Sequence, residues 1–461
     1  MHPPNGVPIT FFSSESVISI TIESPFKLRR TSNAYEMSPS PSELRQLSQP
    51  SSYTEKNDQK DLLTPVSRND VHEDEIWALQ PPVVEQSPGP IPIEVFGRGF
   101  NTTYIPETSE STISWIGTLA SFMLSSSATF AGPILDRGHP RLLLICGTFC
   151  VVFGLMMTSL ADRFWQLLLA QGICTGIGSG QLFIVSVALL PQWFTTKRST
   201  ATGIAATGSS AAAIIYPPMF HYLIDRIGFG WTVRSIAFVA LAVCLVSLSV
   251  ARMRTQPPPR PKIVDFSGFK EPEYALFALV SFFGGIGLFI PFFYITQYCR
   301  ENVGGISDEL AFWMLPILGV GSIFGRTIPA IVADKAGNLN VLAFCTIVSA
   351  LLGLCWIAVD SIAGIITWCL FYGCFSGAFV SLQVPTVVSI TKDPKTIGGR
   401  AGTNNLTCAF GILIGNPIGG VIVKRSLVGL QAFCGAMLVT SAAFIILTRL
   451  KVVGVSLTRK T

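Results

Sequence analysis

Charged side chains are scarce in this sequence of 461 residues. Asp, Glu, Lys and Arg make up 13% of the chain, about half the share of an average soluble protein, whereas 49% of the residues are hydrophobic. With 4 histidines and no C-x-x-C spacing, no zinc site is legible, and we expect no metal and no cofactor. Most of the 11 cysteines lie inside apolar runs without paired spacing, which excludes a disulfide-stapled secreted scaffold. We expect no nucleic-acid partner.

Residues 1–110 differ from the rest because they are rich in Ser, Pro, Thr, Asn and charge. Such a composition buries too little apolar surface to offset the entropy of ordering, so we predict a disordered polar tail. The stretch 7–22 alternates apolar residues with Ser and Glu, but it is too short and polar to span a bilayer and lacks the basic start of a secretory signal. Asn101 begins an N-glycosylation pattern that would be used only on a lumenal face.

Long apolar stretches follow one another from residue 113 onward. Each is near or above the ~18–25 residues that cross a hydrocarbon core of about 30 Å, and without water for the backbone amides each must be a helix. The eleven predicted spans are 113–135, 142–160, 165–190, 200–224, 233–250, 274–296, 310–332, 339–359, 362–390, 402–423 and 428–447. The lipid bilayer is therefore the solvent for three-quarters of the chain.

The basic residues of the loops predict the orientation. One set of alternate loops holds Arg137, Arg141, Lys197, Arg198, five basic residues of 252–270, Lys335, Lys392, Lys395, Arg400 and the C-terminal lysines and arginines. The other set holds Arg163, Arg226, Arg300 and the pair Lys424-Arg425. By the positive-inside rule, the first set and the C-terminus are cytoplasmic.

Features that recur about 200 residues apart indicate an internal duplication. Asp136-Arg137 closes one helix as Asp334-Lys335 closes a later one, and glycines spaced by four recur in both halves. The later half has six spans and the earlier half five, so the missing span would precede residue 113. The predicted parts are a tail (1–110), an N-terminal bundle (111–252), a cytoplasmic loop (253–273), a six-helix bundle (274–450) and a cytoplasmic tail (451–461).

Several of these motifs resemble a known family. The segment Gly132-x3-Asp136-Arg137-Gly138 and its echo at Asp334-Lys335 resemble the loop between the second and third helices of the major facilitator superfamily. The run 193–210, WFTTKRSTATGIAATGSS, is similar to the fifth helix of its monocarboxylate-transporter-like branch, and Pro291-Phe-Phe-Tyr294 and Gly325-Arg326 match fungal members. The resemblance covers roughly 101–450 and implies an all-α membrane fold of two pseudo-symmetric helical bundles, with eleven of twelve spans recognisable here.

Five polar residues inside spans are the candidates for substrate binding: Arg326, Tyr294, Gln297, Gln383 and Asn404. A charge at the depth of Arg326 costs on the order of 2–3 kcal/mol, so its side chain should face the bundle interior or a wet cavity. There it would hold a substrate carboxylate through paired hydrogen bonds, or it would snorkel or clamp a neighbouring helix. Each of the other four would bond a substrate or join helices.

The resemblance gives the charged helix ends a second role. In the family such residues latch neighbouring helices in one conformation, which implies a latch made by Asp136, Arg137, Asp334 and Lys335. The alternative is that these charges only set the topology. Six glycines on helix faces are predicted to allow close helix packing: Gly172, Gly176, Gly180, Gly373, Gly377 and Gly415.

The function these observations favour is secondary transport by alternating access. The resemblance implies a small organic substrate, either a monocarboxylate or other organic anion or, for efflux, a fungal secondary metabolite, and it implies the plasma membrane. Coupling to a proton stays open, because Ser322 stands where animal carriers have an acidic residue. The alternative is a non-transporting relative, a sensor or defective paralogue without the first helix. An enzyme is not expected, since no catalytic constellation is present.

The charge distribution predicts that the C-terminus faces the cytosol. An epitope placed after Thr461 should bind antibody only after cells are permeabilised, whereas an epitope in the loop after Arg300 should bind on intact cells. Labelling of the C-terminal epitope on intact cells would contradict the predicted topology.

Overall fold

The computed structural model describes residues 9–13, 16–20, 110–194, 197–252, 266–393 and 396–454. The chain divides into two compact units, Met1–Val71 and His72–Thr461. In the first unit, strands β1 (Ile9–Ser13) and β2 (Ser16–Ile20) pair antiparallel. Both strands lie within the predicted polar tail of 1–110, and their β-branched and aromatic side chains suit a pleated strand. Asn101 lies outside the described residues.

The described part of the second unit is helical. Its elements are α2 (Glu110–Asp136), α3 (Pro140–Thr158), α4 (Phe164–Leu167), η4 (Leu168–Thr175), α5 (Gly176–Trp193), α6 (Arg198–Val250), η5 (Phe266–Lys270), α7 (Pro272–Leu288), α8 (Ile290–Asn302), α9 (Asp308–Ala336), α10 (Asn338–Cys355), η6 (Trp356–Ala358), α11 (Ile362–Ile390), α12 (Ile397–Val423) and α13 (Leu427–Val453). Three of these helices begin at a serine whose hydroxyl accepts a backbone N–H of the first turn: Ser307, Ser361 and Ser426.

The predicted number of spans is confirmed for the described residues. Ten helical stretches are long and apolar enough to cross a membrane, and the longest, in α6, consists of two helices. They meet at Gly228, whose φ of 74° and ψ of 168° suit glycine. The predicted spans 200–224 and 233–250 lie on the two sides of this break, which brings the total to eleven. Another span consists of α7 and α8, which join at Phe289 just before Pro291.

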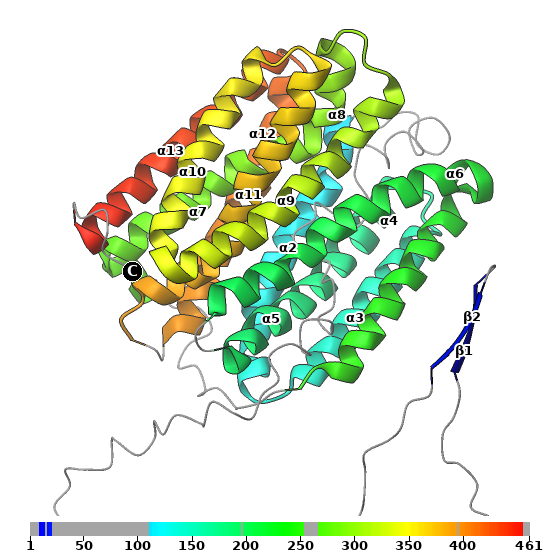
Figure 1. The fold of residues 1–461 in the computed structure, drawn as a ribbon, viewed down its shortest axis with the longest axis horizontal. Coiled ribbons are helices and arrows are strands. Elements are labelled where there is room, and N and C mark those ends of the chain that lie inside the picture. Colours follow the sequence, from blue (N-terminus) through cyan, green and yellow to red (C-terminus); the bar gives the residue numbers. More distant parts are fainter. Residues whose placement is uncertain are drawn as a thin grey trace, which may run out of the picture. The chain divides into compact units, whose positions relative to one another are not determined.

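The helices form two bundles (Figure 1), the first from α2 to α6 and the second from α7 to α13, each with its own buried apolar cluster. In the second bundle α9 packs against α11, and α7 packs against α12 and α13. In the first bundle α2 packs against η4 and α5, as α9 packs against α11. The bundles meet where α2 contacts α12 and where α6 contacts α9 and α11.

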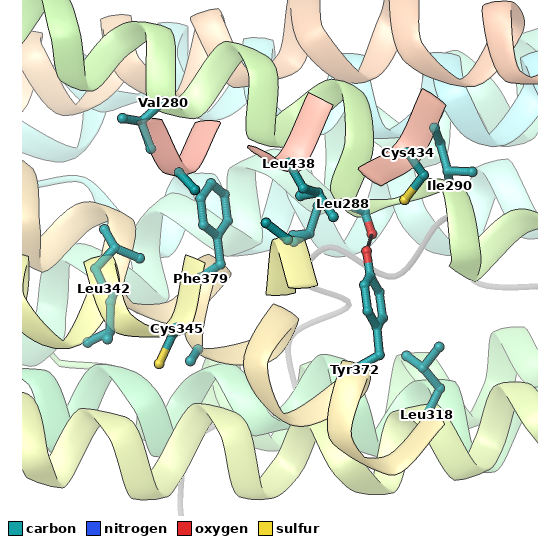
Figure 2. Packing of buried hydrophobic residues seen from close by; sticks show 14 of the residues in the cluster. Val280, Leu288, Ile290, Leu318, Leu342, Cys345, Tyr372, Phe379, Cys434 and Leu438 are labelled. Atoms are coloured by element: carbon teal, nitrogen blue, oxygen red, sulfur yellow. Dashed lines mark hydrogen bonds between the residues drawn. The ribbon is translucent and has the colours of Figure 1, made fainter. Parts of the chain in front are cut away.

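The core of the second bundle is aromatic and fully desolvated. Figure 2 shows Tyr372 of α11 among aliphatic side chains, with its hydroxyl donating to the carbonyl oxygen of Leu288 at 2.9 Å. Tyr372 also stacks on Trp368, at 4.7 Å between ring centroids, and Trp368 stacks on Trp356 at 5.2 Å. Because a membrane offers no water to a buried hydroxyl, this pairing satisfies it inside the bundle.

Large apolar side chains also cover the outside of the bundles. On α3, Phe149 is 64% exposed and stacks on the exposed Phe153. A water-soluble protein rarely exposes apolar patches of the extent seen here, whereas lipid tails solvate them without penalty. The exposed faces therefore agree with a chain embedded in lipid.

The duplication also indicates where a first helix would pack. In the second bundle Phe444 of α13 stacks on Phe283 of α7, at 5.6 Å between ring centroids. The residue of the first bundle that corresponds to Phe444 is found by applying the same sequence offset that separates Asp136 from Asp334. This residue is Val246 of α6, which is 54% exposed. In the second bundle, α7 covers this surface of α13. Among the described helices of the first bundle, none covers the equivalent surface of α6 at Val246.

Glycine allows α9 and α11 to approach backbone to backbone. A Cβ at Gly325 would overlap the carbonyl oxygen of Cys374, and one at Gly373 would overlap that of Leu318. Gly325→Ala should therefore force the helices apart, costing about 1–3 kcal/mol as overpacking does, and should lower the melting temperature of the purified protein.

The matched control is Gly304→Ala, because a Cβ at this loop position meets no atom within 4 Å. It should leave melting unchanged. Equal melting of the two variants would show that the α9–α11 contact does not depend on glycine.

Candidate functional site

A cavity lies between the two bundles. The first bundle contributes residues of α2 to its wall, and the second contributes residues of α11, α12 and the junction of α7 with α8. The cavity is tight in the described conformation, with a volume of about 30 Å³. Its lining residues are Ser121, Leu124, Ser125, Phe289, Phe379, Val380, Gln383, Asn405, Cys408 and Ile412.

Helix register explains which side chains reach this cavity. Phe379 and Gln383 lie one turn apart on α11, and Cys408 and Ile412 lie one turn apart on α12. Gly284 of α7 allows the ring of Phe379 to pack against its backbone, because a Cβ there would overlap the ring edge. A Cβ at Gly285 would lie 2.6 Å from the carbonyl oxygen of Cys408, so glycine at this position lets α7 approach α12 closely. Small residues on α7 thus set the position of both walls.

Of the five predicted binding residues, Gln383 lines the cavity. Asn404 is fully buried instead, and its Oδ1 accepts the hydroxyl of Ser281 at 2.8 Å. The hydroxyl of Tyr294 donates to the backbone oxygen of Asn416 at 3.3 Å, and Gln297 Nε2 donates to Glu301 one turn further along α8. Here Asn404 and Tyr294 join helices, which was the alternative role considered for them.

Asn405, next to Asn404, lines the cavity although it was not among the five candidates. One step along a helix rotates the side chain by about 100°, so the two asparagines face different neighbours. The sequence around them does not show which of the two asparagines faces the cavity.

Arg326 is buried at the seam between α9 and α6, the contact between the two bundles that we call the α6–α9 seam. Its Nη1 donates to the backbone oxygen of Ala206 at 2.9 Å, and its Nε donates to the Ser322 hydroxyl at 3.2 Å. The Ser210 hydroxyl of α6 donates in turn to Ser322, at 3.1 Å. Arg326 does not line the described cavity, and its geometry is that of a clamp between helices.

Asp334 binds the start of α6 across the same seam. Its Oδ1 accepts the backbone N–H of Ser199 at 3.0 Å, and its Oδ2 accepts the backbone N–H and the hydroxyl of Thr200 at 3.0 and 2.6 Å. These N–H groups belong to the first turn of α6, where no intrahelical carbonyl is available and the helix dipole favours an anion. Next to it, the Ser199 hydroxyl donates to Asn338 at 2.8 Å. A carboxylate of one bundle therefore caps a helix of the other.

The other predicted latch residues lie at the same ends of the helices. Asp136, at the end of α2, is buried, while Arg137 and Lys335 are exposed. Within α2, the Thr129 hydroxyl donates to the backbone oxygen of Gly402 in α12 at 3.1 Å. This second contact between the bundles parallels the approach of Gly203 in α6 to α9.

Each of the six predicted packing glycines lies against another helix. Gly172, Gly176 and Gly180 face α2, where a Cβ at Gly176 would lie 2.8 Å from the oxygen of Ala120. Gly373 and Gly377 face α9, and a Cβ at Gly415 would lie 2.5 Å from the oxygen of Ile286 in α7.

Sequence reasoning missed the ion pair between Glu271 and Arg400. The guanidinium of Arg400, at the start of α12, donates to both oxygens of Glu271 at 2.9 and 2.5 Å, and its carbon lies 5.6 Å from the Tyr274 ring centroid. The Tyr274 hydroxyl donates to the backbone oxygen of Arg400 at 2.7 Å. Arg400 is 4% exposed, so the bidentate pair fixes α12 to α7.

The comparison with known families agrees with this arrangement. The sequence model of the Major Facilitator Superfamily matches residues 89–416, which is more than half of the chain. The chain therefore belongs to the Major Facilitator Superfamily and is an integral, multi-pass membrane transporter by family.

Curated relatives include fungal transporters that match most of the chain. An MFS-type transporter of Emericella nidulans is 42% identical over 72% of this chain and 74% of its own length. The agnestins efflux protein of Paecilomyces divaricatus is 34% identical over 78% of this chain and 82% of its own length. The aspyridones efflux protein of Emericella nidulans is 33% identical over 72% and 67%.

Among solved structures, the human organic anion transporter TETRAN superposes with a TM-score of 0.59 and 15% identity, covering 77% of this chain and 89% of that one. At this identity the likeness shows the fold, and the predicted fold class is confirmed.

The buried ion pair predicts an asymmetry between two neighbouring glutamates. Glu271→Gln should cost about 1.5–3 kcal/mol, because it leaves the buried charge of Arg400 with a weaker acceptor, and the purified protein should melt earlier. Glu273→Gln is the control: its partner Lys392 is 77% exposed at 3.9 Å, and surface pairs contribute about 0–1 kcal/mol. Comparable melting of the two variants would disprove a fixing role for the Glu271–Arg400 pair.

Proposed function

We propose that this protein exports a small organic metabolite by alternating access. The observation that carries the proposal is the cavity whose wall comes from both bundles, since rocking one bundle against the other would change which side of the membrane it faces. Efflux is favoured over uptake because relatives across most of the chain are named as efflux proteins for agnestins and aspyridones. The substrate class proposed on this basis is a fungal secondary metabolite, and the membrane is the plasma membrane.

The α6–α9 seam is the element that would open and close. At its cytoplasmic end, by the charge-based topology, Asp334 caps α6, and near the opposite end His221 of α6 stacks on Phe312 of α9 with ring centroids 4.6 Å apart. Between them Arg326 holds the backbone of α6 at Ala206. The described conformation is therefore fastened along the whole length of this seam.

The polar contacts described at this seam are individual hydrogen bonds, which can break when the two bundles separate. A switch between two states must involve a modest free-energy difference, or a ligand could not shift the populations. We assign Asp334 to the latch, Asp136 to the matching position beside α12, and the exposed Arg137 and Lys335 to the charged surface around them.

Gln383 is the residue we assign to substrate contact in the cavity. Arg326 we assign to positioning the two bundles, since its described hydrogen bonds go to Ser322 and Ala206. In this assignment Arg326 does not bind a substrate carboxylate directly. A substitution of Arg326 would still change export, because it would alter the contact between the bundles at the α6–α9 seam.

The latch predicts the effect of one isosteric change on export. In a deletion strain complemented with Asp334→Asn, the ratio of exported to retained metabolite should fall several-fold relative to wild type at equal membrane abundance. Asparagine has one acceptor oxygen where Asp334 uses two, and it carries no charge; losing hydrogen bonds to a charged group costs about 1–3 kcal/mol, which shifts a two-state equilibrium by about 5–150-fold. The measurement is untargeted mass spectrometry of medium and cells for both strains.

The control is Asp308→Asn, at the other end of α9. Asp308 is 71% exposed and pairs with Arg300 at 3.2 Å, so its loss should leave export near wild type. A wild-type chain that changes no metabolite ratio in the deletion strain would instead support the non-transporting alternative. Wild-type export by Asp334→Asn would remove the latch from the mechanism.

A further inference from the structure

The cavity between the bundles is polar without being charged. None of the ten residues that line it is Asp, Glu, Lys, Arg or His. Its polar groups are the hydroxyls of Ser121 and Ser125 and the amides of Gln383 and Asn405. The Ser121 hydroxyl already donates to the backbone oxygen of Gly117 at 2.9 Å, which leaves the Ser125 hydroxyl and the two amides as the other hydrogen-bonding groups.

Among the described residues of this lining, an ionised carboxylate has no cationic partner. The effective cost of taking an ion out of water into a protein interior is several kcal/mol unless a partner charge and further hydrogen bonds compensate for it. Arg326 lies outside the lining, and its guanidinium donates to Ala206 and Ser322. The cavity lining therefore disfavours an anion.

Two aromatic side chains are among the apolar residues that line the cavity. Phe379 comes from α11 and Phe289 from the junction of α7 with α8, and both are held by neighbours: Phe379 by the backbone at Gly284, and Phe289 by Phe292 at 6.0 Å between ring centroids. Rings positioned by rigid helices favour a planar aromatic ligand through offset or edge-to-face contacts.

The two amides supply both donors and acceptors around these rings. Each primary amide offers two N–H donors and a carbonyl acceptor. Gln383 is 7% exposed and lies beside the Cys408 thiol, while Asn405 has no hydrogen-bond partner among the residues that the structure describes. The amides of Gln383 and Asn405 can therefore form hydrogen bonds with uncharged carbonyl, hydroxyl or amide groups of a ligand.

We propose that this cavity binds an uncharged, planar aromatic molecule bearing carbonyl, hydroxyl or amide groups and discriminates against the ionised carboxylate of the same size. This specifies the substrate class of the proposed exporter and so rests on that function. The selectivity follows from Gln383 and Asn405 as the polar contacts, Phe289 and Phe379 as the stacking walls, and the absence of a cation from the lining.

The test uses two probes of equal shape, 2-naphthamide and 2-naphthoate, with the purified full-length protein at neutral pH. Calorimetric titration should give at least about tenfold tighter binding of the amide, a difference of about 1.4 kcal/mol. Equal or tighter binding of the carboxylate, or no binding of the amide, would overturn the proposal. Binding is measured without transport, so failed export with retained selectivity would count against the proposed function alone.

Two substitutions of one residue sharpen the result. Gln383→Leu removes an amide without adding charge and should weaken naphthamide binding several-fold while leaving naphthoate binding weak. Gln383→Lys adds the missing cation and should reverse the preference toward naphthoate. Melting curves identify any variant that fails to fold, and naphthoate binding to wild type that disappears in Arg326→Gln would place the ligand site at Arg326 instead.

A thiol in the lining reports where the probe binds. Naphthamide should slow alkylation of Cys408 by N-ethylmaleimide, followed site by site by mass spectrometry, because Cys408 lines the cavity. The exposed Cys355 at the end of α10 is the internal control and should react at an unchanged rate. Equal protection of both cysteines, or of neither, would show that the probe does not occupy this cavity.

Discussion

Close approach of helix backbones through glycine is the contact on which this structure depends. Lipid tails are as apolar as the side chains they touch, so association of helices in a membrane relies on packing and on hydrogen bonds between helices. Within the bundles, Gly325 and Gly373 bring α9 against α11, and Gly180 brings α5 against α2. Between the bundles, Gly203 brings α6 against the backbone of Arg326. Glycine-mediated backbone contacts therefore occur both inside each bundle and at the interface between the two bundles.

Polar contacts then separate what is fixed from what can move. Inside the second bundle, the pair of Glu271 with Arg400 and the hydroxyl of Tyr372 are buried and hold neighbouring helices together. At the α6–α9 seam, the hydrogen bonds of Asp334 are made to a helix terminus, where water or another acceptor can replace the carboxylate. Among the residues that the structure describes, the cavity lining has no charged side chain, and we propose that shape and neutral hydrogen bonds select its occupant.

The sequence predicted the parts of the fold that depend on local composition. Apolar run length gave the spans, the recurrence of Asp136 at Asp334 gave the duplication, and glycine spacing gave the packing faces. What it could not give were contacts that depend on rotation about a helix axis or on distant segments. Asn404 and Asn405 differ by one rotational step, Glu271 reaches Arg400 only after α7 and α12 pack, and Arg326 finds Ala206 on the other bundle. Of the cavity lining, Gln383 alone was among the predicted binding residues.

The central claim is that the α6–α9 seam opens while each bundle stays intact. Hydrogen–deuterium exchange resolved at single amides tests it most directly, because the N–H groups of Ser199 and Thr200 are bonded to Asp334 across the seam. A latch worth about 1–3 kcal/mol predicts that these two amides are protected only about 5–150-fold, far less than the amides of α9 and α11 around Gly325 and Gly373. Protection of Ser199 and Thr200 equal to that of the α9–α11 core would show that the bundles do not separate there and would contradict the account.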